Sequence, residues 1–517
     1  MNKPNKTFSK TYSKTIDNRS ENLPTLWSNY RANIELEQHN NVRVIDNKTN
    51  KNAIKDNVLD IIKSANDMLV LCSFLLADEG VEQALLAAEK RGVRVYCMIA
   101  AETRLDREEP QGEFDQKVLA QHKAMLKNMA GKIMFRTSSS FHAKVVLADP
   151  FETHPKGGLL TANITKDAMT RNEELLLKLE NKEIRQLAEY LKWGLWEASE
   201  HESIKSGAFE FVSTQNAVKH PKEDLPVIAT TEQRQQISNT ALTMIQNAQQ
   251  SITVSCFGWD LKHATVQALI KKAHSGIAVK VFARTRPASM PALEALQKAG
   301  AQVFGFKWLH AKALLIDEHE AMVMSANFQA HGMDEGFELG IIFNDSRVDE
   351  LIHVFKIWQV KCVWQLRATP TIGEVLGKVL LWDGKKLDED EIQKSIAFNL
   401  GTVTANSAED LQAPAPALTR PGEHLHLAHQ LDCEWIVDAP KLSKDAKEEF
   451  RQDVPEGKNK DEKNHNKKKS KQAKLPYSPP IYREPNGQKV VVIASPEQLE
   501  PARNLKQKLN LEAIVVR

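Results

Sequence analysis

The first 370 residues contain the same series of segments twice, and this internal repeat constrains the fold more than any other feature of the sequence. Residues 62–75 read IKSANDMLVLCSFL and residues 245–258 read IQNAQQSITVSCFG, which aligns Phe74 with Phe257. In each copy the end of a helical pattern precedes a run of apolar and β-branched residues that is typical of a buried strand. The repeat therefore indicates two related domains in one chain.

Further matched segments follow in the same order in both copies. Each copy continues with apolar residues at helical spacing and a second apolar run, and Gly92 and Gly276 stand where each helix should end. Both copies then reach the same short polar motif, an acidic strand and a helix that carries tryptophan. The helical spacing of the tryptophans favours core packing over stacking platforms, an interpretation that covers Trp193, Trp196, Trp358 and Trp364.

Strands that alternate with helices over roughly 150 residues are typical of a layered α/β domain with a largely parallel sheet. The sequence therefore predicts an α/β fold in which two α/β/α units form a pseudo-dimer within the chain. The expected divisions are an N-terminal basic arm (1–50), a first unit (51–205), a second unit (215–370), a C-terminal extension (371–455), a lysine-rich linker (456–484) and a small βαβ segment (485–517).

Composition excludes several classes of protein. The five cysteines lie far apart with no C-x-x-C pair, which argues against a disulfide framework and against a thiolate zinc site. The first 20 residues lack the apolar core of a secretory signal, and no apolar run approaches the ~20 residues that span a bilayer. We therefore expect a cytoplasmic protein without membrane insertion.

Charge is balanced overall, with a formal net charge of +2, but it is unevenly distributed. Residues 458–474 are dominated by lysine, and such a block is either a solvated linker or a segment that attracts polyanions. Three alternating histidines lie nearby without an acidic or thiolate partner at a useful spacing, so we expect an exposed strand there and no metal site: His424, His426 and His429.

The polar motif in each copy is His-x-Lys-x4-Asp, with identical spacing in both. The first copy contains His142, Lys144 and Asp149, and the second contains His310, Lys312 and Asp317. In an extended strand, residues two apart face the same side, so each histidine should project beside its lysine. Each aspartate ends its strand next to a turn, where a capping role and a catalytic role are both open.

Two histidines and two lysines that converge from symmetric halves suit attack on a phosphodiester. One imidazole would attack phosphorus while the other protonates the leaving oxygen, and the ammonium groups would offset charge on the nonbridging oxygens. This chemistry requires no cofactor and no metal.

More polar residues follow each motif at matched positions: Thr161, Asn163 and Glu174 in the first copy, and Ser325, Asn327 and Glu338 in the second. We expect the asparagines, together with the hydroxyl residues two positions earlier, to donate hydrogen bonds to the phosphate oxygens. We expect each glutamate to hold an imidazole by its second nitrogen.

The duplicated motif, with its downstream hydroxyl residue, asparagine and glutamate, resembles the signature of the phospholipase D superfamily over roughly residues 57–365. The resemblance implies a PLD-like fold, metal-independent catalysis and a covalent phosphohistidine, with His142 as nucleophile and His310 as acid by analogy. Leu160 and Met324 stand where the family often has glycine, and Thr161 replaces the usual serine, which leaves the turn geometry there open.

The superfamily acts on lipids and on nucleic acids, so the substrate has to be inferred from the surroundings of the motif. The basic arm and the lysine block favour a nuclease that acts on DNA rather than RNA, in bacterial defence or restriction, with a helicase or another defence protein as partner. A lipid phosphodiesterase or phosphatidyl transferase is the first alternative, and a nucleic-acid-binding module for a partner enzyme is the second. Since both motifs lie in one chain, we expect no obligate dimer.

Overall fold

The computed structural model of the chain describes residues 8–37, 39–105, 113–212, 218–405, 481–483, 489–493 and 513–516. The chain divides into two compact units, a larger one of Asn22–Pro370 and Gly377–Ile392, and a smaller one of Met1–Glu21, Thr371–Leu376 and Gln393–Arg517. The lysine-rich segment, the three alternating histidines and the helix expected in the βαβ segment lie outside the described residues.

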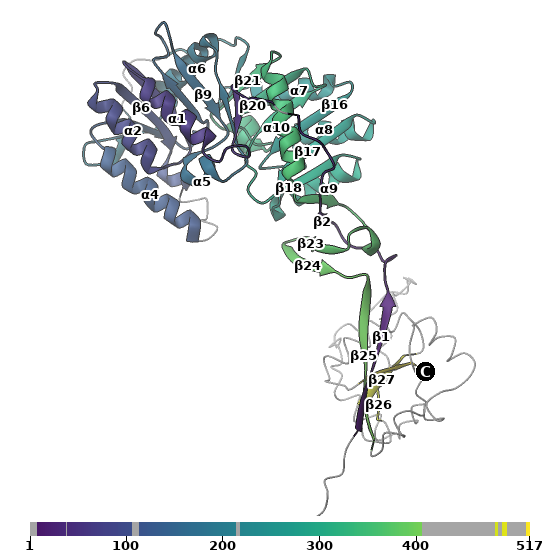
Figure 1. Cartoon of the computed structure of the whole chain (residues 1–517). Coiled ribbons are helices and arrows are strands. Elements are labelled where there is room, and N and C mark those ends of the chain that lie inside the picture. Colours follow the sequence, from purple (N-terminus) through teal and green to yellow (C-terminus); the bar gives the residue numbers. More distant parts are fainter. Residues whose placement is uncertain are drawn as a thin grey trace, which may run out of the picture. The chain divides into compact units, whose positions relative to one another are not determined.

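The larger unit consists of two halves, each with one sheet that is covered by helices (Figure 1). The first sheet runs, in spatial order, β13 (Phe209–Phe211), β12 (His201–Ser203), β7 (Met134–Ser138), β6 (Arg94–Ala100), β4 (Met68–Cys72), β8 (Val145–Ala148), β9 (Lys156–Leu160), β11 (Leu175–Lys178) and β3 (Val44–Asp46). The helices of this half are α1 (Ala53–Ser64), α2 (Glu79–Lys90), α3 (Glu102–Leu105), α4 (Glu113–Met129), α5 (Lys166–Thr170) and α6 (Asn181–Trp193). A short parallel pair joins β5 (Leu76–Ala77) and β10 (Ile164–Thr165).

The second sheet runs β15 (Arg234–Gln235), β14 (Val227–Thr231), β21 (Glu338–Phe343), β20 (Glu320–Met324), β19 (Ala313–Ile316), β16 (Ser251–Cys256), β17 (Ala278–Arg284), β18 (Gln302–Phe306), β22 (Trp364–Arg367), β2 (Leu26–Asn29), β23 (Gly377–Trp382) and β24 (Leu387–Ile392). The helices of this half are α7 (Gln236–Asn247), α8 (Ala264–His274), α9 (Met290–Lys298) and α10 (Arg347–Lys361).

The two sheets repeat the same strand order, which confirms the predicted duplicated α/β fold. From β12 to β3 the first sheet reads β12-β7-β6-β4-β8-β9-β11-β3, and the second reads β22-β18-β17-β16-β19-β20-β21-β14. Gly92 and Gly276 follow the ends of α2 and α8 with φ of +89° and +90°, the left-handed conformation that glycine adopts at low cost.

The expectation of a largely parallel sheet was wrong. Within the two large sheets, the parallel pairs are confined to β4, β6 and β7 in the first half and to β16, β17 and β18 in the second. The strand after each motif pairs antiparallel with both of its neighbours, as β8 does with β4 and β9. Only a short loop connects β8 to β9, and a parallel pair would need a crossover of about a dozen residues or more.

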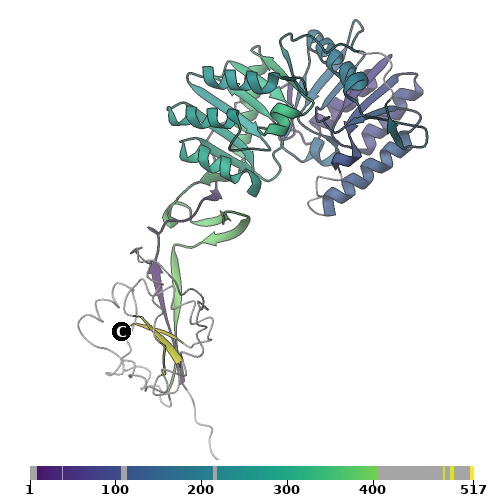
Figure 2. The same ribbon diagram turned by 180° about the vertical axis from the view of Figure 1, so that it is seen from behind.

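Helices α6 and α10 form the middle of the larger unit, while α1, α2 and α4 cover one outer side and α7, α8 and α9 the other, as both views show (Figures 1 and 2). One continuous core joins apolar residues of both halves, including Leu187 of α6 and Val354 of α10. Trp193 and Trp358 are buried in this core as expected, whereas Trp196 and Trp364 are partly exposed.

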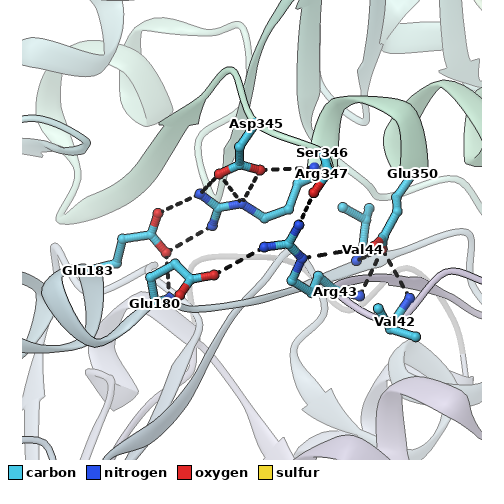
Figure 3. A network of polar contacts seen from close by, with 9 residues as sticks. All are labelled: Val42, Arg43, Val44, Glu180, Glu183, Asp345, Ser346, Arg347 and Glu350. Atoms are coloured by element: carbon cyan, nitrogen blue, oxygen red, sulfur yellow. Dashed lines mark hydrogen bonds and ion pairs between the residues drawn. The ribbon is translucent and has the colours of Figure 1, made fainter.

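A network of charged side chains, of which Arg347, Glu183 and Glu350 are buried, also joins the two halves (Figure 3). The Arg347 guanidinium, at the start of α10, donates to both carboxylate oxygens of Glu183 in α6 at 2.8 and 2.9 Å, and it also binds Asp345. Glu350 accepts backbone N–H bonds from residues 42–44, which lead into β3. Breaking a buried pair leaves an uncompensated charge, so these contacts fix how the halves meet.

The terminal segments of the larger unit belong to its sheets. Sequence analysis grouped residues 1–50 as a basic arm, but β2 joins the second sheet and β3 the first. The reason is burial, because Leu26 and Trp27 of β2 are fully buried. Likewise β23 and β24, from the expected extension, continue the second sheet.

The smaller unit contains a two-stranded antiparallel ribbon and a three-stranded sheet. The ribbon pairs β1 (Phe8–Asp17) with β25 (Ser395–Ala405). The sheet contains β26 (Ile481–Arg483), β27 (Lys489–Ile493) and β28 (Ala513–Val516), and β27 and β28 pair in parallel where two strands of a βαβ segment were expected.

Candidate active site

Each motif lies in the extended segment that enters the central strand β8 or β19, and this places its histidine beside its lysine. Lys144 and Lys312 are fully buried. The ammonium group of each donates to the carbonyl oxygen of the histidine two residues earlier, His142 or His310. Lys312 also lies 3.0 Å from Nδ1 and 3.2 Å from Nε2 of His310.

The backbone of each motif is anchored on the opposite half. The amides of His142 and Ala143 donate to the carbonyl oxygen of Phe337 at 3.2 and 2.9 Å. In the same way, the amides of His310 and Ala311 donate to the carbonyl oxygen of Glu173 at 3.0 and 2.9 Å. Each anchor stands one residue before a glutamate of the site, so the two motifs and the two glutamates meet at the junction of the halves.

The glutamates bind the imidazoles crosswise. Nδ1 of His142 lies 2.6 Å from Glu338 of the second half, and Nδ1 of His310 lies 2.9 Å from Glu174 of the first half. A neutral imidazole that donates from Nδ1 to a carboxylate presents the lone pair of Nε2. The histidine side chains are 13% and 14% exposed, so a substrate can reach them.

The electrostatics of the site favour neutral imidazoles and ionised glutamates. Burial lowers the pKa of His142 and of His310, and the adjacent glutamates offset only part of that shift. Burial raises the pKa of Glu338, but its contact with His142 and the nearby Lys144 ammonium outweigh burial and lower the pKa to about 2. In the free protein these shifts favour uncharged imidazoles, and a glutamate oxygen lies 2.6 Å from Nδ1 of His142 and 2.9 Å from Nδ1 of His310.

The two hydroxyl residues, which were expected to donate to phosphate oxygens, donate to the glutamates of the site. Thr161 donates to Glu174 at 2.6 Å, and Ser325 donates to Glu338. The reason is the strand pairing, because the amides of Thr161 and Ser325 bind the strands that begin beside those glutamates. Each glutamate is thus fixed by a hydroxyl of its own half while it holds the imidazole of the other half.

The asparagines differ in their surroundings. Oδ1 of Asn327 accepts from the Cys256 thiol at 3.6 Å, whereas the buried Oδ1 of Asn163 has no hydrogen-bond partner within the described part of the chain. A buried polar atom without a partner is rare in proteins. The side-chain oxygen of Asn163 is therefore an acceptor for a donor that the described residues do not supply.

Asp149 and Asp317 hold the backbone. Each adopts a positive φ, 49° and 51°, and each carboxylate accepts three backbone N–H bonds of 2.7 to 2.9 Å from the residues that start β4 or β16. Burial raises the pKa of the Asp149 carboxyl. The N–H donors lower this pKa by more than burial raises it, so the net shift is downward. The geometry supports the capping role of these residues.

Substitution of Asp149 should lower stability and spare catalysis. We expect Asp149→Ala to cost about 2–4 kcal/mol, because three N–H groups lose a charged acceptor and the alanine must adopt a positive φ. Asp149→Asn, which tolerates this conformation, should cost about half as much. Thermal unfolding measures the loss. A folded Asp149→Asn protein with strongly reduced specific activity would contradict this assignment.

Aromatic and cationic side chains next to the histidines were missed in the sequence analysis. The ring of Phe74 lies 5.4 Å from that of His142, and the ring of Phe257 lies 5.0 Å from that of His310. The Arg286 guanidinium lies over Phe257 at 4.4 Å, and that of Arg171 lies over Trp308 at 4.0 Å. Comparing the charged residues of the two copies in the sequence would have shown that Arg284 and Arg286 have no cationic counterparts in the first copy.

The described residues contain no candidate metal centre and no helix that could span a membrane. Among them, no group of three or more His, Cys, Asp or Glu side chains could hold a metal ion. Within the same ranges, no helix is long and apolar enough to cross a bilayer. Four cysteines are buried free thiols: Cys72, Cys97, Cys256 and Cys362.

Comparison with known proteins finds related sequences over both halves. A family model described as "Cardiolipin synthase, PLD-like domain" matches residues 58–196 and 241–358, which include the histidines, lysines, asparagines and glutamates of the site. Cardiolipin synthase B of Shigella flexneri is 24% identical over 179 residues, and so is cardiolipin synthase B of Salmonella typhi. The match covers 33% of this chain and 38% of each relative, so it spans well under half of their length.

Solved structures with a similar arrangement include a phosphatidylserine synthase of Haemophilus influenzae, at 12% identity and a TM-score of 0.46, over 67% of this chain and 89% of that one. Nuc of Salmonella typhimurium, described as a phospholipase D family member, matches at 23% identity and a TM-score of 0.24, over 30% of this chain and 95% of its own.

Proposed function

The chain belongs to the phospholipase D superfamily, and from this premise we propose that the crosswise site cleaves a phosphodiester through a phosphohistidine. The observation that carries the proposal is the pairing of each imidazole with a glutamate of the opposite half, at 2.6 and 2.9 Å. This pairing leaves two Nε2 atoms, one from each half, at the same junction. A nucleophile and a proton donor for one phosphate are thereby supplied by equivalent residues.

The reaction has two steps. Nε2 of His142 forms a bond to phosphorus while the bond to the leaving oxygen breaks, and His310, which takes up a proton when the anionic phosphate binds beside it, gives that proton to the leaving oxygen. Water then attacks phosphorus, His310 takes the proton of the water, and the bond between phosphorus and His142 breaks. The assignment of His142 as the nucleophile follows the family analogy, since the contacts of the two histidines are nearly symmetric.

The lysines and asparagines stabilise the charge that the phosphorus centre carries. Lys144 and Lys312 are held as buried ammonium groups, and a buried cation interacts strongly with an anion that reaches it. Lys144 donates one hydrogen bond to the His142 carbonyl oxygen, and Lys312 contacts the carbonyl oxygen and the ring nitrogens of His310. An ammonium group has three N–H donors, so Lys144 keeps two of them for the nonbridging oxygens. The amide of Asn163 supplies another donor.

This arrangement gives a testable pH dependence. Burial lowers the pKa of Lys144 to about 7, with a further contribution from Lys312 and partial compensation by Glu338. The ammonium form of Lys144 is the form that stabilises charge at phosphorus, and it is present below about pH 7 and lost above it. We therefore expect kcat/KM to fall by about tenfold per pH unit above about pH 7. A flat profile between pH 6 and 9, with the fold intact by circular dichroism, would count against this role of Lys144.

We propose DNA as the substrate. The site provides cations and aromatic rings at its rim. The lysine-rich segment favours a polyanion. A defence role with a helicase partner and a cytoplasmic location remain predictions.

A phosphatidyl transferase is the second candidate. It is supported by the family model, whose description names cardiolipin synthase, and by the cardiolipin synthases among the relatives. The same phosphohistidine would then pass its phosphatidyl group to an alcohol in place of water.

One experiment separates the candidates. The purified protein is incubated with labelled DNA, RNA and phosphatidylglycerol vesicles, each in EDTA, alongside His142→Ala and His310→Ala. Cleavage of DNA by the wild type alone supports the nuclease, and head-group release or exchange by the wild type alone supports the transferase. The proposed chemistry would be refuted if every observed activity required added Mg²⁺, or if activity survived in both histidine variants.

A further inference from the structure

The rim of the active site is asymmetric, although the catalytic residues are nearly symmetric. Beside His310 the Phe257 ring lies under two guanidinium groups, Arg284 at 5.2 Å and Arg286 at 4.4 Å. Trp308, two residues before His310, lies under Arg284 at 5.2 Å and Arg171 at 4.0 Å. We call these five residues the arginine–aromatic cluster.

The equivalent positions beside His142 carry no cation. Met98 pairs with Cys72, two residues before Phe74, and Phe282 pairs with Ser255, two residues before Phe257. Met98 and Phe282 are therefore equivalent positions. Ala100 and Glu102 follow Met98 at the same spacing at which Arg284 and Arg286 follow Phe282, so they are the equivalents of the two arginines. By the same count from the motif and from the glutamates, Ser140 corresponds to Trp308 and Glu335 corresponds to Arg171. One rim therefore carries three arginines where the other carries alanine and two glutamates.

The cluster is built to present guanidinium groups. An aromatic face holds a guanidinium in plane, and the edge N–H groups of a guanidinium can bind an anion in bidentate fashion. Arg171 forms an ion pair with Asp167 at 3.3 Å, whereas Arg286 forms no ion pair with a carboxylate among the residues that the structure describes. Arg284 also lies near the reacting centre, because it adds to burial in lowering the pKa of Lys312.

We propose that the arginine–aromatic cluster binds the phosphate of the nucleotide that adjoins the scissile phosphate on the leaving side, so that a nucleic-acid strand enters the site in one direction. This inference rests on the proposed function. In an in-line displacement the leaving oxygen lies opposite the nucleophile His142, hence toward His310 and the cluster. A second phosphate at nucleotide spacing is a feature of every nucleic-acid strand and suits the three arginines.

The test compares thymidine dinucleotides that carry an extra terminal phosphate at either the 5′ or the 3′ end with the plain dinucleotide and with bis(p-nitrophenyl) phosphate. We expect only one of the two terminal phosphates to raise kcat/KM, by about 10-fold to 100-fold. Arg286→Ala and the milder Arg286→Lys should shrink that advantage, measured as a ratio within each variant. Glu102→Ala, at the matched position of the other rim, should leave the ratio and the basal rate unchanged.

The outcomes distinguish the proposed phosphate subsite from the phosphodiesterase function on which it rests. A one-sided advantage that Arg286→Ala removes supports the subsite. Equal advantages from both phosphates, or an advantage that Arg286→Ala leaves intact, overturn the subsite while the phosphodiesterase function stands. If bis(p-nitrophenyl) phosphate is hydrolysed but no dinucleotide is, the nucleic-acid assignment itself fails. Loss of phospholipid turnover in Arg286→Ala, with no effect on dinucleotides, would also overturn the proposal in favour of a lipid substrate.

Discussion

We expect His142→Ala and His310→Ala each to lower the rate of phosphodiester cleavage by about 10⁴-fold or more. The loss is large for both because each imidazole is required in both steps, one as the atom that carries the phosphoryl group and the other as acid and then base. Steady-state assays on the preferred substrate measure it. The histidine side chains are partly exposed, so the variants should fold, and a melting temperature near that of the wild type is the control.

His142→Ala and His310→Ala should differ in activity on a substrate whose leaving group needs no proton. p-Nitrophenolate leaves without general acid, so His310→Ala should still release it in a first turnover, whereas His142→Ala should not. Reversed behaviour of the two variants would exchange the roles of the histidines. Equal retention of steady-state activity in both would contradict a shared site.

The second large effect is expected at a residue on the opposite half from the histidine it serves. Glu338→Gln should lower kcat by about 10²–10⁴-fold, because the amide no longer fixes Nδ1 of His142 as a charged acceptor. The equivalent variant of the first half, Glu174→Gln, should lower kcat to a similar extent because Glu174 holds His310. Glu189→Gln, which removes an exposed carboxylate on α6, is the matched control and should have little effect.

The pH profile separates this role from a general loss of structure. Burial lowers the pKa of Lys144 and the Glu338 charge raises it, so removal of that charge should move the alkaline fall in kcat/KM to lower pH. A Glu338→Gln protein with an unshifted profile and wild-type kcat would show that the carboxylate has no part in the reaction.

The duplication and the motif were readable from the sequence because they depend on spacing alone. His142 and His310, Glu174 and Glu338, and the strands that carry them fall at matched positions in both copies. What spacing cannot show is which glutamate holds which histidine. A pairing within one half and a pairing across the halves fit the same pattern, and the contact between His142 and Glu338 joins residues 196 apart.

Other features failed to be predicted for local reasons. Strands β2 and β3 contain four and three residues, too few to show a period, so their segment was interpreted as an arm. Thr161 and Ser325 were expected to face the substrate, because sequence does not reveal that the neighbouring strand brings a carboxylate to the hydroxyl. The arginine–aromatic cluster was open to prediction, since Arg284 and Arg286 have no cationic counterparts in the first copy.

The central claim is that two imidazoles, one from each half, act on one phosphate. The most direct measurement is mass spectrometry of His310→Ala after reaction with bis(p-nitrophenyl) phosphate in EDTA and an alkaline quench, which preserves phosphohistidine. The account expects one p-nitrophenylphosphoryl group per chain, located on His142, and none when His142 is also replaced. Release of p-nitrophenolate without any covalent adduct, or only after Mg²⁺ is added, would contradict it.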